Sequence, residues 1–139
     1  GKTFFLYQRM AELLRSGERR EMLTRIPAAL DSVRVCELQQ RVRRVHVADI
    51  LLDYLQKLIQ RSRERPDVKL GLSPRAGQGL LRAAQAWALL QGRSAVLPED
   101  VQAVFPAIAS HRLVAEDMAT SRGSRELALD LLRSQPVPE

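Results

Sequence analysis

Hydrophobic residues recur every three or four positions along most of this 139-residue chain, which is the period of an amphipathic helix. Between residues 48 and 64, for example, Leu51, Leu55, Leu58 and Ile59 fall on one helical face. Strand signals are sparse, since only residues 44–47 alternate like a strand, and so short a stretch does not build a sheet alone. The pattern predicts helices over residues 4–16, 18–25, 33–43, 48–64, 74–91, 98–113 and 124–133.

The helix at residues 74–91 has the clearest boundaries. Ser73 is a good N-cap, Pro74 suits the first helical position, and Gly92 is the expected left-handed stop. Several alanines on this helix allow a neighbouring helix to approach closely, and Trp87 is predicted to lie in the core.

The next helix carries a proline near its middle. Pro98 should open it, because proline is favoured at the first position and acidic residues follow. Pro106 should then kink the helix or split it before residues 107–113. Helices joined by short polar loops, with no sheet, predict an all-α fold: a small helical bundle with an N-terminal helical arm.

Composition narrows the class of protein. The chain is 45% hydrophobic, which is enough for a packed core, and no apolar run approaches the ~20 residues that span a bilayer. Cys36 is the single cysteine, so no internal disulfide can form, and without a neighbouring base it is no candidate nucleophile. A lone cysteine fits a reducing compartment, and we expect a cytoplasmic protein.

The charge balance favours anionic partners. The 22 Lys and Arg residues, most of them arginine, outnumber 16 acidic residues and give a net charge of +6. Nucleic acid, phosphate-bearing ligands and acidic protein surfaces would all be attracted. One arginine cluster is expected to be a solvated face: residues 41, 43, 44, 61, 63 and 65.

Arg75 is the candidate binding residue. It follows Pro74 at the start of a long apolar helix, where the helix dipole carries positive charge and opposes a guanidinium by about 0.3–1 kcal/mol. A guanidinium beside free backbone N–H groups forms a suitable place for an anion, and phosphate fits both. A solvated arginine without a role remains the alternative.

Seven short motifs extend this picture. In order, they are VHV (45–47), LDY (52–54), GLSPRA (71–76), LLRAA (80–84), GR (92–93), PEDV (98–101) and SHRL (110–113). Together they closely resemble the C-terminal lid of MoxR-type AAA+ ATPases. We therefore expect residues 45–139 to form the lid domain and residues 1–44, which match more loosely, to form the helical segment that connects it to an ATPase core.

The resemblance implies a role for each residue of the Ser-Pro-Arg motif. In that family the lid packs over the nucleotide, and the arginine of this motif is the sensor 2 residue that reaches the ATP phosphates. Carried over, the nucleotide-binding residues are Ser73, Pro74 and Arg75, and none of them is catalytic. Leu97 stands where the family often has Ser or Thr, so the helix that Pro98 opens is expected to lose its usual side-chain cap, worth about 1 kcal/mol.

The resemblance also implies cofactors and partners for the full-length protein. ATP and Mg²⁺ would bind there, but not to this fragment alone. The expected partners are the ATPase core, copies of the same protein in a hexameric ring, and a protein with a von Willebrand factor A domain. In such a ring the arginine cluster described above could contact a neighbouring subunit instead of being a solvated face. The expected work is chaperone-like remodelling of protein complexes.

The parts of an ATPase site that the chain lacks are informative. Gly1-Lys2-Thr3 spells the end of a phosphate loop, but no strand or glycines precede it and no strand ending in paired acids follows. We expect that this chain alone does not hydrolyse ATP. We also expect no metal site, since His46 and His111 lack nearby carboxylates at a ligand spacing.

Two alternative functions stay open at this point. The first is a free-standing basic module that binds nucleic acid, which the charge favours, although the chain has few aromatic residues and no helix-turn-helix pair. The second is an unrelated helical bundle that binds other proteins.

Overall fold

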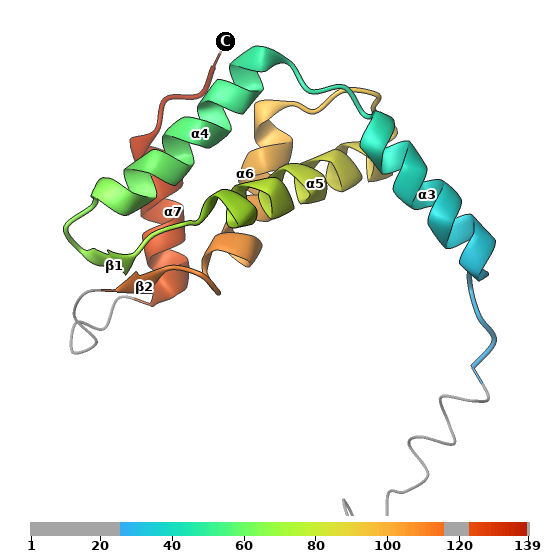
Figure 1. Cartoon of the computed structure of the whole chain (residues 1–139), viewed down its shortest axis with the longest axis horizontal. Coiled ribbons are helices and arrows are strands. Elements are labelled where there is room, and N and C mark those ends of the chain that lie inside the picture. Colours follow the sequence, from blue (N-terminus) through green and yellow to red (C-terminus); the bar gives the residue numbers. More distant parts are fainter. Residues whose placement is uncertain (1–25, 116–122, 139) are drawn as a thin grey trace, which may run out of the picture. The chain divides into compact units, whose positions relative to one another are not determined.

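The computed structural model describes residues 26–115 and 123–138. Within these ranges lie five helices and two short strands (Figure 1): α3 (Ser32–Arg44), α4 (Asp49–Glu64), β1 (Val68–Leu70), α5 (Pro74–Leu90), α6 (Pro98–Ala109), β2 (Val114–Ala115) and α7 (Ser124–Ser134). The all-α prediction is therefore confirmed. The helices predicted at 4–16 and 18–25 lie outside the described residues.

The chain divides into two compact units between Val35 and Cys36, and each is described by itself. In the first, the Asp31 carboxylate begins α3 by accepting a hydrogen bond from the Arg34 N–H at 2.7 Å. The second contains the rest of α3 and all the other elements. The predicted domain boundary after residue 44 stays a prediction.

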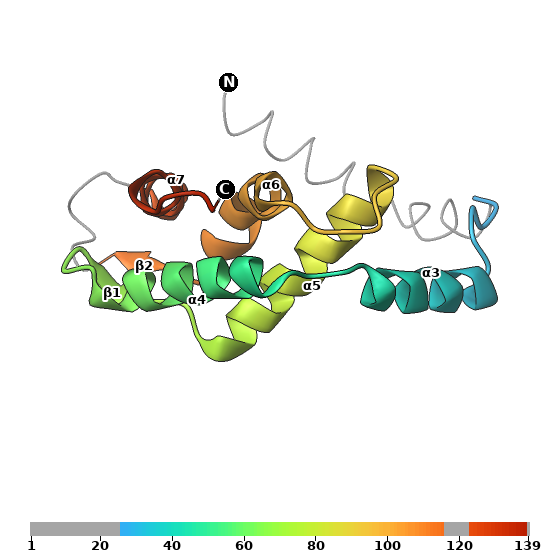
Figure 2. The ribbon, with the colours of Figure 1, turned by 90° about the horizontal axis from the view of Figure 1, so that it is seen from above.

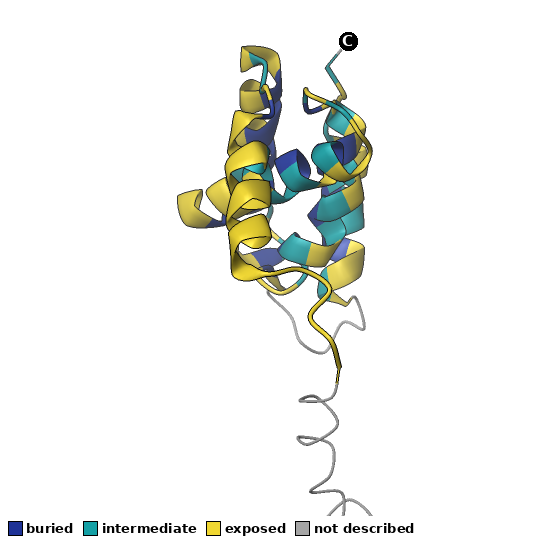
Figure 3. Ribbon diagram, turned by 90° about the vertical axis from the view of Figure 1, so that its right-hand side faces the viewer, coloured by how far each residue is buried: buried dark blue, intermediate teal, exposed yellow. Residues whose placement is uncertain are grey.

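The core of the second unit lies among α4, α5, α6 and α7. Helix α5 contacts both α4 and α6, and α7 packs against α6 and α4 (Figures 1 and 2). Figure 3 shows the buried residues on the faces that these helices turn toward one another. The largest fully buried side chains include Tyr54, Phe105, Leu58 and Leu80.

Helix α5 buries a line of small residues, and the tryptophan lies beside that line. Its buried residues are Ala76, Gly77, Leu80, Ala84, Gln85 and Ala88. The prediction that Trp87 is a core residue is wrong, because its side chain is 40% exposed, and Leu90 is 78% exposed. The four-residue spacing of Ala76, Leu80, Ala84 and Ala88 sets the buried face, and Trp87 precedes Ala88 by one residue, about 100° around the helix.

Two short stretches of extended backbone join distant parts of the chain. Strands β1 and β2 pair antiparallel, with Val68 opposite Ala115 and Leu70 opposite Val114. This ladder was not expected from the sequence, because two or three residues carry too little pattern to predict a strand. The strand-like stretch at 44–47 forms a single parallel bridge, between His46 and Ala95.

Helix α6 continues through Pro106 without a break. Of the two predicted outcomes, a kink or a split, the split is therefore wrong, and the kink stays a prediction. Its last turn ends at Ala109, where the Ser110 N–H donates to the Pro106 carbonyl at 3.2 Å. Proline has no N–H and therefore removes one hydrogen bond from the helix. Pro106 lies close to the end of α6, where the loss of one bond does not interrupt the helix. No helix within the described ranges is long and apolar enough to cross a bilayer.

Candidate functional site

The first turn of α5 has one free backbone donor. The Ser73 Oγ accepts from the Ala76 N–H at 3.1 Å, and the Ser73 carbonyl accepts from the Gly77 N–H at 3.1 Å. Pro74 has no N–H. Among the described residues, no group accepts from the Arg75 N–H. The sequence led us to expect several free N–H groups at this helix start. Only the Arg75 N–H remains free among the described residues, because Ser73 accepts the hydrogen bonds of the Ala76 and Gly77 N–H groups.

The Arg75 side chain is exposed and free. The described part of the chain gives it no hydrogen bond and no ion pair, and the first turn of α5 carries no acidic residue. A guanidinium and a backbone N–H of the same residue thus lie together at the positive end of a 17-residue helix. Both groups can donate hydrogen bonds to an oxyanion that is not part of this chain.

A buried serine fixes the loop that leads to this turn. The Ser62 side chain is fully buried near the end of α4, where its hydroxyl donates to the Ile59 carbonyl at 2.6 Å. The same oxygen accepts from the Leu72 N–H at 2.8 Å. Gly71 passes so close to α4 that an added Cβ would lie 2.5 Å from the Ser62 carbonyl oxygen. The residue before the N-cap therefore has one defined position.

Helix α5 also packs against α4 at Gly77. Gly77 is buried, and a Cβ at this position would collide with the Cδ1 atom of Ile59. Leu72 and Ala76 are buried on either side of the turn. The exposed Arg75 is thus held by a rigid base rather than by a loop.

A polar bridge crosses the middle of α5. The Arg82 guanidinium donates to the Gln85 Oε1 at 3.0 Å, and the Gln85 amide donates to the Val45 carbonyl at 2.9 Å. Gln85 is buried, and His46 continues the contact through its N–H to the Ser94 carbonyl at 2.8 Å. Gln85 was not predicted from the sequence, although a glutamine between Ala84 and Ala86 on an apolar face was a usable signal.

The far end of α5 closes with a Schellman motif. Gly92 adopts a φ of 76°, its N–H donates to the Leu89 carbonyl at 3.0 Å, and the Arg93 N–H donates to the Ala88 carbonyl at 2.9 Å. The predicted glycine stop is therefore confirmed. Beyond it, the Arg93 guanidinium pairs with the carboxylate of Asp100, which is fully buried.

Asp100 also caps the next helix. Its Oδ2 accepts from the Leu97 N–H at 2.9 Å, which is one half of a capping box. The leucine side chain offers no acceptor for the other half, as expected from its chemistry. The loss of the Ser or Thr cap is thus partly compensated by the residue three positions later.

Comparison with known proteins settles the family. The sequence model of the AAA lid domain matches residues 60–130, half of the chain, with all of α5 and α6 inside the match. The chain belongs to the AAA lid domain family. This lid is similar to the uncharacterized protein YeaC of Bacillus subtilis (35% identity; 73% of this chain, 32% of the relative). It is also similar to chaperone MoxR1 of Mycobacterium tuberculosis (34%; 73% and 30%).

Further matches agree. Protein MoxR of Paracoccus denitrificans is 52% identical over 46 residues, which are 33% of this chain and 14% of that protein. A crystal structure from Cytophaga hutchinsonii, named as an ATPase, superposes with a TM-score of 0.67 at 26% identity and covers 72% of this chain and 34% of that one. The lid is the C-terminal lid region of a MoxR-type AAA+ ATPase, and it spans about a third or less of the length of these proteins.

The arginine cluster of the lid does not form one patch. Arg41, Arg43 and Arg44 lie in the last turn of α3, whereas Arg61 and Arg63 lie in the last turn of α4. A 16-residue helix, about 24 Å long, separates the two groups. Sequence proximity of basic residues therefore overstated their proximity in space.

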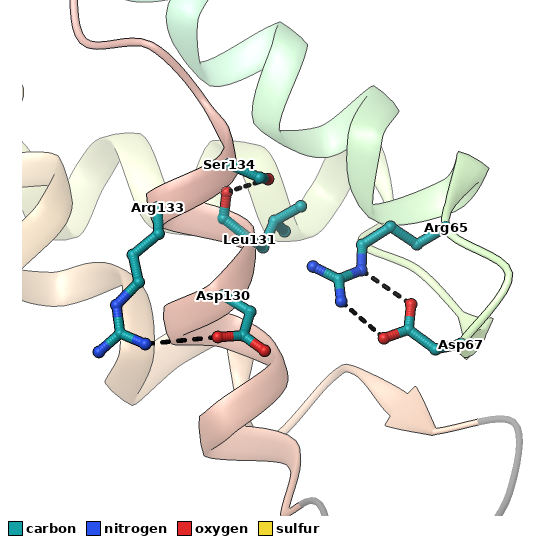
Figure 4. Close-up of polar contacts among 6 residues, drawn as sticks. All are labelled: Arg65, Asp67, Asp130, Leu131, Arg133 and Ser134. Carbon is teal, nitrogen blue, oxygen red and sulfur yellow. Dashed lines mark hydrogen bonds and ion pairs between the residues drawn. The ribbon is translucent and has the colours of Figure 1, made fainter.

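Arg65, the residue that follows α4, forms an ion pair with Asp67 (Figure 4). Its Nε and Nη2 donate to the two carboxylate oxygens of Asp67 at 2.8 and 2.6 Å. The hydrogen bond with Asp67 raises the Arg65 pKa against the opposing effect of burial, and the charge of Asp130 on α7 adds to the rise. The Arg65 side chain therefore has a structural role in its ion pair with Asp67. The sequence alone did not distinguish it from the exposed arginines nearby.

The cysteine, the two histidines and the Gly1-Lys2-Thr3 segment considered in the sequence are not part of a site among the described residues. Cys36, His46 and His111 are exposed. Gly1-Lys2-Thr3 lies outside the described residues. Within residues 26–115 and 123–138, no group of three or more His, Cys, Asp and Glu side chains could hold a metal ion.

Proposed function

We propose that this lid carries the sensor 2 residue of its ATPase, with Arg75 reaching the terminal phosphate of ATP held by the core. The observation that carries the proposal is the free guanidinium of Arg75 on a capped, rigidly seated helix start. Ser73 and Pro74 serve by shaping that start. Membership in the AAA lid family and the likeness to proteins named MoxR support the assignment.

The electrostatics of the turn fit this ligand. The N-terminal end of α5 carries about half a positive charge, and Arg75 adds a full one. The repulsion between them, about 0.3–1 kcal/mol, is relieved when a phosphate oxygen lies between the guanidinium and the Arg75 N–H. Because no acidic residue stands in this turn, the contribution of the lid to the nucleotide is cationic. Mg²⁺ would be held by residues of the core, where it would neutralise phosphate charge.

Helix α5 offers a path by which contact at Arg75 could move the rest of the lid. It runs unbroken from Pro74 to Leu90 and is tied to Val45 through Gln85. A shift of the helix start toward the nucleotide would therefore carry the segment at 45–47 with it. In our proposal this motion couples ATP hydrolysis to chaperone-like remodelling of protein complexes.

The wider assembly belongs to the same proposal. It consists of a hexameric ring of full-length subunits in the cytoplasm, acting with a partner that contains a von Willebrand factor A domain. The name of the mycobacterial relative, chaperone MoxR1, supports the chaperone-like part. No arrangement among the described residues favours the alternative of a free-standing nucleic-acid module.

The test compares two arginines in a protein that carries this lid with its ATPase core. Arg75→Ala should lower kcat for ATP hydrolysis about 100-fold, as expected for loss of one preorganised charge donor at the reacting phosphate. Arg125 occupies the same second position in α7 and is also exposed, so Arg125→Ala is the matched control. Equal rates for the two variants would refute the sensor role.

A further inference from the structure

A cavity lined by arginines lies at the opposite end of α5 from Arg75. It measures about 350 Å³ and is lined by Arg41, Arg44 and Arg93, together with Val45, Leu89 and residues 92 and 94 of the closing loop. The length of α5, 17 residues or about 25 Å, separates it from the proposed ATP contact. The function proposed above assigns nothing to it.

Two of the three arginines that line this cavity, Arg41 and Arg44, have no acidic partner among the described residues. Arg93 is paired with Asp100, but its Nε is buried with no partner among the described residues. Arg41 and Arg44 form no ion pair within the described part of the chain, and no acidic side chain lines the cavity. The side chains converge from two elements, the end of α3 and the loop after α5.

Helix-end electrostatics explain only part of this arrangement. Arginines in the last turn of α3 are favourable because a helix C-terminus is negative. That effect applies equally to Arg43, which does not line the cavity. It does not explain why Arg41 and Arg44, three residues apart on one face, meet Arg93 around a shared space.

The lining also has a non-polar wall. Val45 is buried and Leu89 is partly buried, and both border the cavity beside the arginines. Ser94 adds a hydroxyl on the same rim. Arginine forks match phosphate oxygens in pairs, and pockets of about 300–1,000 Å³ hold small organic ligands. The volume therefore accommodates a phosphate together with a small apolar group.

We propose that this cavity binds the phosphate group of a small organic phosphate, with Arg41 and Arg44 holding the oxygens and Val45 and Leu89 contacting the organic part. Arg93 is shared between the ligand and Asp100. The site would give the lid an anion response separate from the one at Arg75.

The test is a titration of the 139-residue chain with methyl phosphate and phenyl phosphate at constant ionic strength, followed by amide NMR. We expect saturable shifts at Gly92 and Ser94, with phenyl phosphate binding several-fold more tightly because its ring meets the apolar wall. Equal affinity of the two probes would show that the site takes phosphate alone and would overturn the organic part of the proposal.

Three variants decide whether the arginines form the site. Arg44→Ala should weaken binding about tenfold, since a charge-assisted hydrogen bond is lost. Arg43→Ala removes the same charge from the same helix turn and should leave affinity unchanged. Arg41→Ala repeats the test in case the first variant perturbs α3. Equal weakening by Arg43→Ala, or shifts confined to Ala76 and Gly77 at the start of α5, would overturn the proposal.

Discussion

The buried hydroxyl of Ser62 accepts a hydrogen bond at 2.8 Å from the N–H of Leu72, ten positions later in the chain. Ser62 ends the buried face of α4, and Leu72 immediately precedes the N-cap of α5. One side chain thus fixes where the first turn of α5 begins, and with it the position of Arg75. A polar residue on a buried helical face has here become the base of the candidate site.

Ser62→Ala should destabilise the lid by about 1–3 kcal/mol, because the buried Leu72 N–H would lose the one acceptor that the described residues offer it. Denaturant unfolding of the two chains measures the difference. Ser134 forms a similar bond to the Leu131 carbonyl at 2.8 Å (Figure 4). Because Ser134 is exposed, Ser134→Ala is the control, and its stability is expected to lie within about 0.5 kcal/mol of the parent. Equal losses would mean that burial of the Leu72 N–H is unimportant.

Two glycines on either side of the first turn of α5, Gly71 and Gly79, should respond in opposite directions to alanine. A Cβ at Gly71 would lie 2.5 Å from the backbone oxygen of Ser62, so Gly71→Ala should cost about 1–3 kcal/mol as the loop shifts. A Cβ at Gly79 would meet nothing within 4 Å, so Gly79→Ala should stabilise α5 by about 0.5–1 kcal/mol. Thermal unfolding of both variants checks the pair, and a change of the same sign would contradict the close approach at Gly71.

The Arg93–Asp100 pair should be the electrostatic contact on which stability depends most. Asp100→Ala removes the partner of Arg93 and the cap of Leu97 together, and we expect a loss of about 3 kcal/mol. Glu99→Ala removes an exposed neighbouring charge and should change stability by about 0.5 kcal/mol or less. Chemical denaturation in low and high salt checks this, because a buried pair is screened little. A loss that vanishes in high salt would argue against it.

Long periodic segments were predictable from the sequence, and the details of packing were not. The bounds of α4, α5 and α7 agree with the predicted ranges within about one residue, because caps and apolar stripes mark them. Trp87 was misplaced because hydrophobicity alone does not separate residues one position apart on a helix. The split predicted at Pro106 was wrong because the free-energy cost of a proline inside a helix depends on how soon the helix ends.

The residues of the candidate site could be predicted from the sequence, but the contacts that hold them in place could not. Ser73 and Arg75 follow from capping rules and from the resemblance to MoxR-type lids. The support from Ser62, ten residues before Leu72, depends on how α4 and α5 pack, which no local pattern contains. The same is true of the cavity at Arg41, Arg44 and Arg93, whose members come from two elements.

Tyr54 should make the lid less stable in alkaline solution. Burial raises the pKa of its phenol above 10.0, and the nearby Gln102 side chain only partly opposes the rise. The unfolded chain therefore loses this proton first, so stability is intact below about pH 10 and falls as the pH rises toward the folded pKa. The hydroxyl also has no hydrogen-bond partner among the described residues. Tyr54→Phe should consequently be neutral or stabilising by about 1 kcal/mol at pH 8.

The difference between the two chains carries the test. Titration of other groups is common to both, so the stability advantage of Tyr54→Phe should widen between pH 8 and pH 10.5 in paired thermal unfolding experiments. An advantage that stays constant would mean that the phenol ionises equally easily in the folded and unfolded chains. A marked loss of stability at pH 8 would show that the hydroxyl has a partner, such as a bound water between Tyr54 and Gln102.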